Sequence, residues 1–420
     1  MKKSNSLILV LLIIISVLFS SCAEVDSEIT IDYADTTKDI DYSKYAGTEL
    51  SVYNWGYYIS DGADGTIDVN EEFEKLTGIR IVYDNYDSNE SLYAKLDGGG
   101  ADYDVVIPSD YMIGRLIKEG YLAELNFDNI PNYKYIDEKY KNTKYDPENK
   151  YSVPYNVGMV GIIYNTTVVE GTPDSWDLMW SEQYKGKILN FNNSRDAFAI
   201  SQFYQGIDIN TENKADWDKA YDMLAKQKPL LQSYVMDEVF NKMESGEAAV
   251  APYYAGDFFT MYGNNEDLAF YYPKEGTNRF IDAACVLKDS KNKEAAELYI
   301  NFLLDPEIAR ANAEYMYYAS PNTAVVENED YRAFLDELHP DAFNILYESS
   351  TKVPTNDFVN LSDDTKAYMS EKWTKLGATA TEEETNNTVY IICLIIIILL
   401  AVWFIYAKIQ KITREKNYNP

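Results

Sequence analysis

Histidine and cysteine are scarce in this 420-residue sequence, which contains one histidine, His339, and three scattered cysteines. The cysteines, Cys22, Cys285 and Cys393, are too few and too far apart for a disulfide framework or a zinc cluster. The sequence also lacks a Gly-x-Ser-x-Gly nucleophile elbow and a glycine-rich phosphate loop after a strand. We therefore predict no catalytic residue, no cofactor and no metal site. Two-carboxylate chemistry stays formally open, because some of the 68 acidic residues will pair by chance.

Basic residues are also few, since 37 lysines and arginines stand against 68 acidic residues and give a formal net charge of −31. This balance disfavours nucleic acid, whose phosphates need a surplus of lysine and arginine. A cationic partner fits the charge better; the alternative is an acidic surface that only keeps the protein soluble. The 46% hydrophobic content suffices for one two-lobed unit or two domains, and the 38 tyrosines suit ligand-lining surfaces as well as cores.

The N-terminus has the layout of a secretory signal sequence. Lys2 and Lys3 precede an apolar run from Leu7 to Phe19, which small residues and Cys22 follow. Residues 1–21 are therefore predicted to be a signal peptide of the lipoprotein type, with lipidation of Cys22. Phe19 stands where that motif prefers leucine, and an uncleaved N-terminal anchor is the alternative.

The C-terminus contains an uncharged, mainly apolar stretch at residues 388–407, about the length that one helix needs to cross a bilayer. Glutamates lie in the polar linker before it, residues 377–387, whereas lysines and an arginine follow it in residues 408–420. The positive-inside rule places this basic tail in the cytoplasm and the rest of the chain outside. Both ends thus predict an extracytoplasmic, membrane-anchored protein.

Between these ends, strand and helix patterns alternate. Residues 22–45 are polar and acidic without periodicity and are expected to form a spacer. Strands expected at 50–54, 79–83 and 103–107 alternate with helices closed by Gly78 and Gly120, which is typical of a parallel α/β sheet. The extended apolar stretch at 151–165 contains Gly158 and Gly161, as expected where a chain crosses between lobes. Further helices are predicted near 176–180, 217–225 and 293–304.

A calcium loop is one interpretation of the segment Ser60–Glu71, because its acidic residues occupy the late positions of an EF-hand loop. Ser60 and Gly62, however, stand at the first two ligand positions. The preferred interpretation is a loop that caps the next helix.

Motifs spread along the chain resemble, in order, those of the spermidine/putrescine-binding proteins of bacterial ABC importers. They are Val52-Tyr53-Asn54-Trp55 with Tyr58, Thr77–Leu96, Tyr103–Tyr111, Tyr151–Tyr155, Tyr184-Lys185-Gly186, Pro273–Gly276, Asn301–Pro306 and Ser320–Asn322. The resemblance covers about residues 47–376. It implies an α/β fold of the type 2 periplasmic-binding-protein class, with two discontinuous lobes that close over a ligand by a hinge. The first lobe would hold residues 46–159 and 282–326, and the second 160–281 and 327–376.

Carried over position by position, the resemblance implies ten ligand-binding residues: Trp55, Tyr58, Ser109, Tyr111, Asn193, Asp196, Tyr254, Phe280, Asp282 and Tyr318. The chemistry suits a polyamine, because each ammonium needs a carboxylate and the methylene chain needs apolar or aromatic walls. Taken singly, Trp55 and Phe280 could instead be core aromatics, and Ser109 and Asp196 helix caps. Asp110 is expected to be an N-cap for the helix that follows it.

The chain departs from the family's pattern at four pocket positions. The family commonly has aspartate at Asn193, glutamate at Asp196, and tryptophan at Tyr254 and Phe280; a serine or threonine is also common at Gly56. One carboxylate fewer favours a diamine such as putrescine over spermidine.

The resemblance implies a monomeric receptor that delivers putrescine or spermidine to ABC permease subunits. Two alternatives remain: a membrane-tethered polyamine receptor for a signalling partner, and a binding protein for another cationic amino solute.

Overall fold

The computed structural model describes residues 31–99, 102–348, 352–378, 395, 397 and 398. The chain divides into two compact units, Met1–Tyr33 and Ala34–Pro420, and the fold reported below is that of the second unit. Within the described residues, no helix combines the length and apolar character needed to cross a membrane. The predicted signal peptide, Cys22 and almost all of the predicted span at 388–407 lie outside these residues.

The first lobe is built from parallel strands connected by helices, as its alternating pattern predicts. Strand β1 pairs in parallel with β2 on one side and β3 on the other. Helices α3, α4 and α5 connect or follow these strands, and the elements are β1 (Glu49–Trp55), α3 (Val69–Thr77), β2 (Arg80–Tyr86), α4 (Asn89–Asp97), β3 (Val105–Val106) and α5 (Asp110–Glu119). Leu92, Val106 and Ile113 lie in its core, together with Ala283 from a strand much later in the chain.

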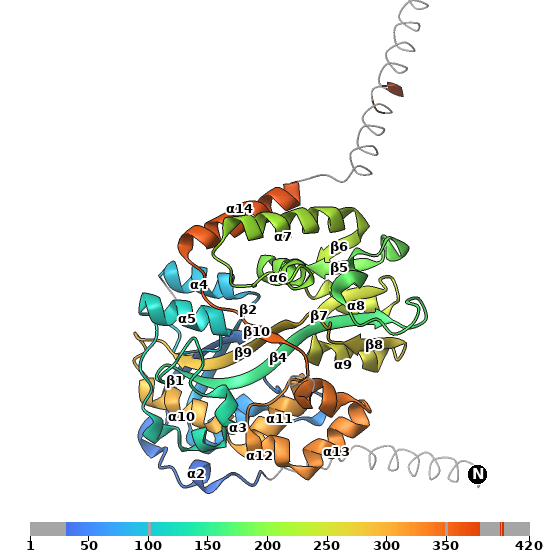
Figure 1. Ribbon diagram of the computed structural model, residues 1–420. Helices are drawn as coiled ribbons and strands as arrows, with labels where there is room; N and C mark the ends of the chain where they lie inside the picture. The colour runs from blue at the N-terminus through green and yellow to red at the C-terminus, as the bar shows by residue number, and fades with distance from the viewer. Residues whose placement is uncertain (1–30, 100–101, 349–351, 379–394, 396, 399–420) are drawn as a thin grey trace, which may run out of the picture. The chain divides into compact units, whose positions relative to one another are not determined.

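The second lobe contains strands β5, β6, β7 and β8, which continue the strand order beyond β4; β7 and β8 both pair with β4, and β5 pairs with β6 and β7. Helices α7 and α14 pack together at the top of Figure 1, where Phe198, Trp217 and Leu361 share a core. The elements are β5 (Ile188–Phe191), α6 (Ser194–Tyr204), α7 (Lys214–Gln227), β6 (Leu231–Val235), α8 (Glu238–Glu244), β7 (Val250–Tyr254), α9 (Ala255–Asn264), β8 (Leu268–Tyr271) and α14 (Asp363–Ala378). The helix predicted near 176–180 is a 3-10 helix, Trp176–Trp180.

Two long antiparallel strands, β4 (Ser152–Asn165) and β9 (Thr277–Val286), connect the two lobes (Figure 1). Strand β4 pairs with β9 up to Met159, and from Val160 onward it pairs with β7. Its pairing partner therefore changes from β9 to β7 between Met159 and Val160. All 14 residues of β4 are buried, which explains why its sequence is mainly apolar, with Ser152, Asn156 and Asn165 as buried polar exceptions.

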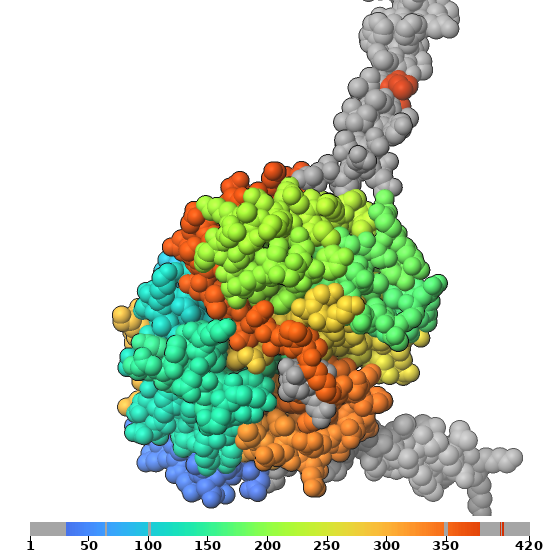
Figure 2. All heavy atoms as spheres, in the orientation of Figure 1, coloured from blue at the N-terminus to red at the C-terminus, as the bar shows by residue number. Residues whose placement is uncertain are grey.

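A third connection, which we call the strap, consists of residues 352–362. It contains β10 (Thr355–Asp357), which pairs in parallel with the start of β9, and it leads into α14. Figure 2 shows this orange-red segment at the surface, beside residues of both lobes. The chain reaches the strap through α10 (Lys293–Leu303), α11 (Pro306–Met316), α12 (Thr323–Glu327) and α13 (Glu329–Leu338).

The segment expected to be a spacer is part of the fold from Ala34 onward. It contains a short helix, α2 (Asp35–Lys38), and the Thr37 and Tyr42 side chains are buried. The Ala34 amide donates to an Asp305 carboxylate oxygen at 2.9 Å. Among the described residues, only 31–33 of the expected spacer stay outside this unit.

Two helix starts test predictions about caps. Asp68 caps α3 by accepting a hydrogen bond from the Glu71 amide, which confirms the capping interpretation of the acidic loop. Helix α5 begins at Asp110 with Ser109 at the N-cap position. The prediction that Asp110 is the N-cap is therefore wrong; its carboxylate instead accepts a hydrogen bond from the Tyr111 amide at 2.6 Å.

Candidate functional site

Four aromatic rings form a continuous row where the crossing strands meet the two lobes; we call it the aromatic row. Its centroid separations are 5.4 Å from Tyr254 to Phe280, 6.1 Å from Phe280 to Tyr318 and 5.7 Å from Tyr318 to Tyr58. The rings meet edge to face, the arrangement that aromatic quadrupoles favour. Tyr254 ends β7 and Phe280 lies on β9, so two strands contribute rings to the row.

Glycines allow two of these rings to lie against backbone. A Cβ atom on Gly158 of β4 would stand 2.1 Å from Phe280 Cζ, and one on Gly256 would stand 2.6 Å from the Tyr318 ring. Contacts that short do not occur between real atoms, so each ring needs its glycine.

A carboxylate bonds to each of three tyrosines in the row. The Tyr58 hydroxyl donates to Asp282 at 2.5 Å, the Tyr254 hydroxyl to Asp196 at 3.0 Å, and the Tyr318 hydroxyl to Asp257 at 2.9 Å. The row thus brings together carboxylates from β9, α6 and α9. Alternating acidic groups and ring faces can bind cations and alkyl chains along one path.

Asp282 is 4% exposed and has the best-defined surroundings. Besides Tyr58, the Ser109 side chain lies close enough to lower the pKa of this carboxylate, and the Asn89 side-chain amide donates to the Ser109 hydroxyl at 3.1 Å. Burial nevertheless raises the pKa of Asp282 to about 6. Its Oδ1 atom is buried and has no hydrogen-bond partner among the described residues, so this oxygen is available to a donor from a ligand.

Asp196 lies in the first turn of α6, where Asn193 is the N-cap. The Asn193 amide donates to Asp196 at 2.9 Å, while its oxygen accepts from the Arg195 backbone amide. Burial raises the pKa of Asp196 to about 6, although the Tyr254 hydroxyl and the Arg195 guanidinium favour the charged form. Asn193 therefore supports a carboxylate without adding a second one.

Asp257 was not among the predicted ligand residues. Burial raises its pKa to about 7, which the hydrogen bond from Tyr318 only partly opposes. It lies three residues after Tyr254, in the first turn of α9. This spacing, which brings side chains to one side of a helix start, is the one sequence signal that could have found it.

Trp55 and Tyr111 contact the periphery of the group. The Trp55 ring packs on Tyr86 at 4.6 Å, and its indole nitrogen is buried with no hydrogen-bond partner in the described ranges. The Tyr111 hydroxyl donates to Glu90, and its ring meets Phe358 of the strap edge to face at 6.1 Å. The structure thus brings eight of the ten predicted residues together around the three carboxylates, whereas the contacts given above for Trp55 and Tyr111 are with residues outside this group.

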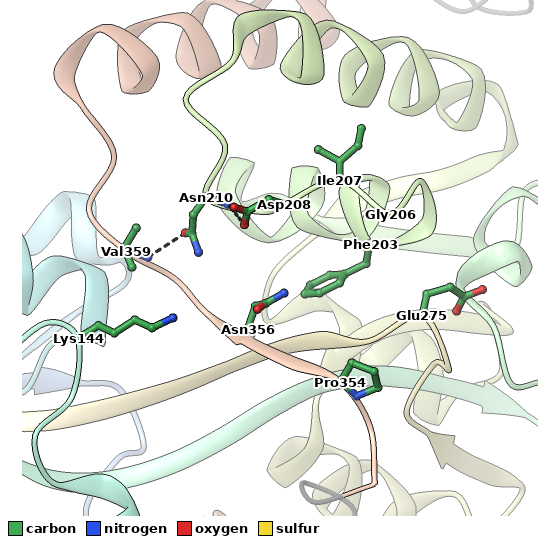
Figure 3. Close-up of a pocket in the computed structure, with 10 residues that line it drawn as sticks. All are labelled: Lys144, Phe203, Gly206, Ile207, Asp208, Asn210, Glu275, Pro354, Asn356 and Val359. Atoms are coloured by element: carbon green, nitrogen blue, oxygen red, sulfur yellow. Dashed lines mark hydrogen bonds between the residues drawn. The ribbon is translucent and has the colours of Figure 1, made fainter.

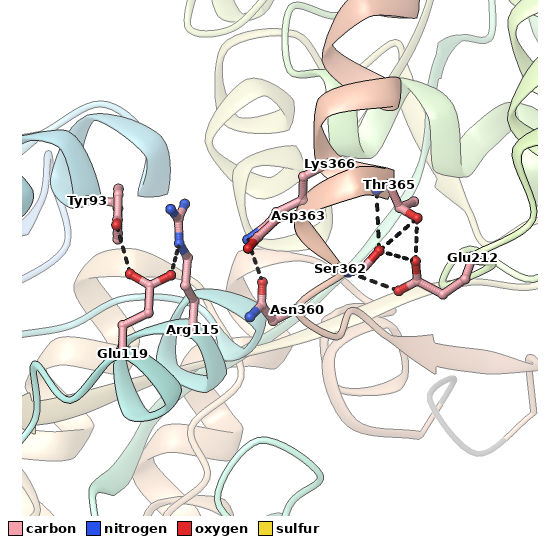
Figure 4. A network of polar contacts seen from close by, with 9 residues as sticks. All are labelled: Tyr93, Arg115, Glu119, Glu212, Asn360, Ser362, Asp363, Thr365 and Lys366. Atoms are coloured by element: carbon pink, nitrogen blue, oxygen red, sulfur yellow. Dashed lines mark hydrogen bonds and ion pairs between the residues drawn. The ribbon is translucent and has the colours of Figure 1, made fainter.

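Charged side chains from both lobes approach each other beside the strap (Figure 4). On α5, Arg115 pairs with Glu119, which also accepts from the Tyr93 hydroxyl. On α14, Lys366 pairs with Asp363. Lys366 is close enough to act electrostatically on Glu119, and Arg115 on Asp363, so opposite charges face each other across the two lobes.

A separate cavity of about 580 Å³ lies between Lys144, the end of α6 and the strap (Figure 3). Its ten lining residues include none of the predicted ligand residues and none of the three carboxylates of the aromatic row. In the part of the chain that the structure describes, no group of three or more histidine, cysteine or acidic side chains could hold a metal ion.

Comparison with known proteins decides the family. Residues 103–341, more than half of the chain, match the family of bacterial extracellular solute-binding proteins. The chain belongs to this family.

Its relatives include the spermidine/putrescine-binding periplasmic protein of Salmonella typhimurium, which is 31% identical over 78% of this chain and 91% of that protein. The putrescine-binding periplasmic protein of Escherichia coli is 32% identical over 66% of this chain and 78% of that protein. Among solved structures, the spermidine/putrescine ABC transporter substrate-binding protein of Streptococcus pneumoniae has a TM-score of 0.67 and 30% identity, covering 79% of this chain and 99% of that one.

These comparisons show the α/β periplasmic-binding-protein fold that the resemblance implied, and membership in an extracellular family agrees with an extracytoplasmic location.

The fit of the Phe280 ring over Gly158 gives a first prediction. Gly158→Ala should displace the ring and weaken binding of an alkyl-ammonium ligand by about tenfold, because one wall of the row moves. Calorimetric titration with putrescine measures the loss. Gly263→Ala in α9 is the matched control, since a Cβ there meets no atom within 4 Å. Equal affinities for Gly158→Ala and the unmodified protein would contradict the assignment of Phe280 to the site.

Proposed function

We propose that this protein is the polyamine-binding component of an ABC importer. The observation that carries the proposal is the aromatic row with its three hydrogen-bonded carboxylates, Asp196, Asp257 and Asp282. Relatives at 31% and 32% identity, named for spermidine and putrescine binding, support the same ligand class.

In the proposed complex, an extended polyamine lies along the aromatic row. Asp282, with Tyr58 and Ser109 beside it, holds one ammonium group, and its unpartnered Oδ1 accepts the ammonium proton. Asp196, supported by Asn193 and Tyr254, and Asp257, supported by Tyr318, hold positive charge further along the row. The faces of Phe280 and Tyr318 pack on the methylenes, and each ring that faces an ammonium contributes on the order of 0.5–2 kcal/mol. The Trp55 and Tyr111 side chains border the ligand at its sides.

Binding of the polyamine would be coupled to closure of the lobes. We place the lobe boundaries at residues 159/160 and 281/282, and residues 327–376 complete the second lobe. The hinge is formed by β4 and β9, where β4 changes pairing partner. The opposite charges on α5 and α14 favour the closed form (Figure 4). The closed monomer then delivers its ligand to the permease subunits.

The membrane attachment is part of the proposal. A lipid on Cys22 after removal of residues 1–21, a span at 388–407, or both, would keep the receptor at the outer face of the cell membrane. Mass spectrometry of the mature N-terminus distinguishes a lipidated Cys22 from an uncleaved chain.

Calorimetric titration of the purified full-length protein with putrescine, spermidine and arginine tests the ligand class. We expect putrescine to bind with a Kd of about 1 μM or below, and arginine to bind at least about 100-fold more weakly, because its carboxylate would face three buried acidic groups. Saturable arginine binding with no response to either polyamine would replace this proposal with that of a receptor for another cationic amino solute.

A further inference from the structure

Arg195 is a buried cation next to Asp196, one of the carboxylates of the aromatic row. It is the second residue of α6 and is 5% exposed. Its Nη2 atom donates to the Asn210 side chain at 2.8 Å and to the Val359 carbonyl of the strap at 3.1 Å. The guanidinium carbon lies 4.5 Å from the centroid of the Phe358 ring, on the same strap. Arg195 is therefore held in place by several independent contacts.

Two of its nitrogen atoms, Nε and Nη1, are buried and lack a hydrogen-bond partner within the described ranges. A buried guanidinium that uses only part of its donors is costly unless nearby charge stabilises it. The groups around it are acidic or phenolic, namely Tyr111, Asp110, Asp196 and Glu90. Burial lowers the pKa of Arg195 to about 10, although these four groups favour its charged form. The side chain therefore stays charged at neutral pH.

The surrounding acids differ in what they can offer a ligand. Glu90 is exposed and accepts from the Tyr111 hydroxyl. Asp110 bonds to a backbone amide, and burial holds its pKa well above its usual range, which favours its neutral form. Asp196, by contrast, is bonded to the aromatic row and follows Arg195 directly in the chain. Among the acids near Arg195, Asp196 is therefore the one that belongs to the aromatic row, and the guanidinium favours its charged form.

We propose that Arg195 determines the charge of the ligand: its guanidinium offsets one of the three carboxylates of the aromatic row and leaves a net charge that matches two ammonium groups. The proposal rests on the proposed polyamine function and deepens it. A diamine is then neutralised by the site, whereas a triamine brings a third ammonium group close to the guanidinium. The repulsion between these two desolvated cations selects against the longer, more highly charged polyamine.

Charge variants of α6 test this role. Arg195→Met removes the charge and keeps much of the side-chain volume, and it should raise the affinity for spermidine relative to putrescine by about tenfold. Arg195→Lys keeps the charge and should leave that ratio within about threefold of the original. Asn193→Asp adds a carboxylate at a position where aspartate is an equally good N-cap, and it should move the ratio in the same direction as Arg195→Met.

The strap contacts of Arg195 require a separate control, because Arg195→Met also removes the hydrogen bonds to Asn210 and Val359. Asn210→Ala loosens the strap without changing any charge, since the Asn210 side chain also accepts from the Val359 amide (Figure 3) and donates to the Asp357 carbonyl. Its spermidine to putrescine ratio should stay unchanged while its melting temperature falls. If Asn210→Ala shifts the ratio as far as Arg195→Met does, the strap and not the charge controls selectivity, and the proposal is overturned.

Two outcomes distinguish a failure of this inference from a failure of the proposed polyamine function. Failure of the unmodified protein to bind either polyamine would defeat the proposed function. Diamine binding by the unmodified protein, together with an unchanged ratio in both Arg195→Met and Asn193→Asp, would defeat only the role of Arg195.

Discussion

Replacement of Asp282 by asparagine should weaken putrescine binding by at least about 100-fold, roughly 3 kcal/mol, because an ammonium group would remain buried without a counter-ion. The carboxylate is 4% exposed and already uses Oδ2 to accept from Tyr58. An asparagine amide at this place would direct N–H donors either at the Tyr58 hydroxyl or at the ligand. Isothermal calorimetry of Asp282→Asn beside the unmodified protein measures the difference.

Two comparisons make this result specific to charge. Tyr58→Phe removes the hydrogen bond to Asp282 but leaves the carboxylate, so its loss of affinity should be about tenfold or less. The ligand-free Asp282→Asn protein should be at least as thermally stable as the original, since a buried charge with an elevated pKa has been removed. An Asp282→Asn protein that is folded and binds putrescine within threefold of the original would show that Asp282 does not contact the ammonium.

The parts of the site that the sequence could predict lie in contiguous motifs. Trp55 ends one strand and Tyr58 follows it, and Ser109 and Tyr111 follow another strand, so each pair is positioned by the local end of a strand. The crossing strand was predictable for a similar reason: residues 152–165 are mainly apolar because every one of them is buried. Local pattern and local structure agree at these places.

The parts that could not be predicted depend on contacts between distant segments. Asp257 enters the site through Tyr318, 61 residues later, and Arg195 contacts Val359, 164 residues later. The prediction of a spacer was wrong from Ala34 onward for the same reason. Residues 34–45 are acidic and lack periodicity, yet Thr37 is buried because Asn132, 95 residues away, donates to its hydroxyl. Composition gives no information about such partners.

The structure gives the site a different set of charged groups from the one that the sequence predicted. From the sequence, Asp196 and Asp282 were the two carboxylates, and the count alone favoured a diamine. The structure adds Asp257 and, beside Asp196, the buried Arg195. One additional anion and one additional cation leave the net charge as it was, so the diamine preference now rests on a balance of four groups that mutation can disturb.

Affinity for the polyamine should fall steeply on acidification, and this is the second large effect. Burial raises the pKa of Asp257 to about 7 and those of Asp196 and Asp282 to about 6. All three must be ionised to bind ammonium groups, which themselves stay protonated throughout this range. Between about pH 7.5 and about pH 5.5 the affinity for putrescine should therefore drop by about 100-fold or more. At about pH 6.5, binding should release protons, which calorimetry in two buffers of different ionisation enthalpy detects.

The stability of the ligand-free protein should change in the opposite direction. A carboxyl group whose pKa is raised by folding stabilises the folded state at a pH below its unfolded pKa, near 3.8 here, and that contribution is lost as the pH rises through the folded value. Acidification from about pH 7.5 to about pH 5.5 should thus raise the melting temperature of the ligand-free protein while it lowers the affinity. If acid weakened binding by unfolding the protein, both quantities would fall together. If acidification instead raises the melting temperature while it lowers the affinity, and both changes are smaller in Asp257→Asn, then the groups that titrate are the buried carboxylates of the aromatic row.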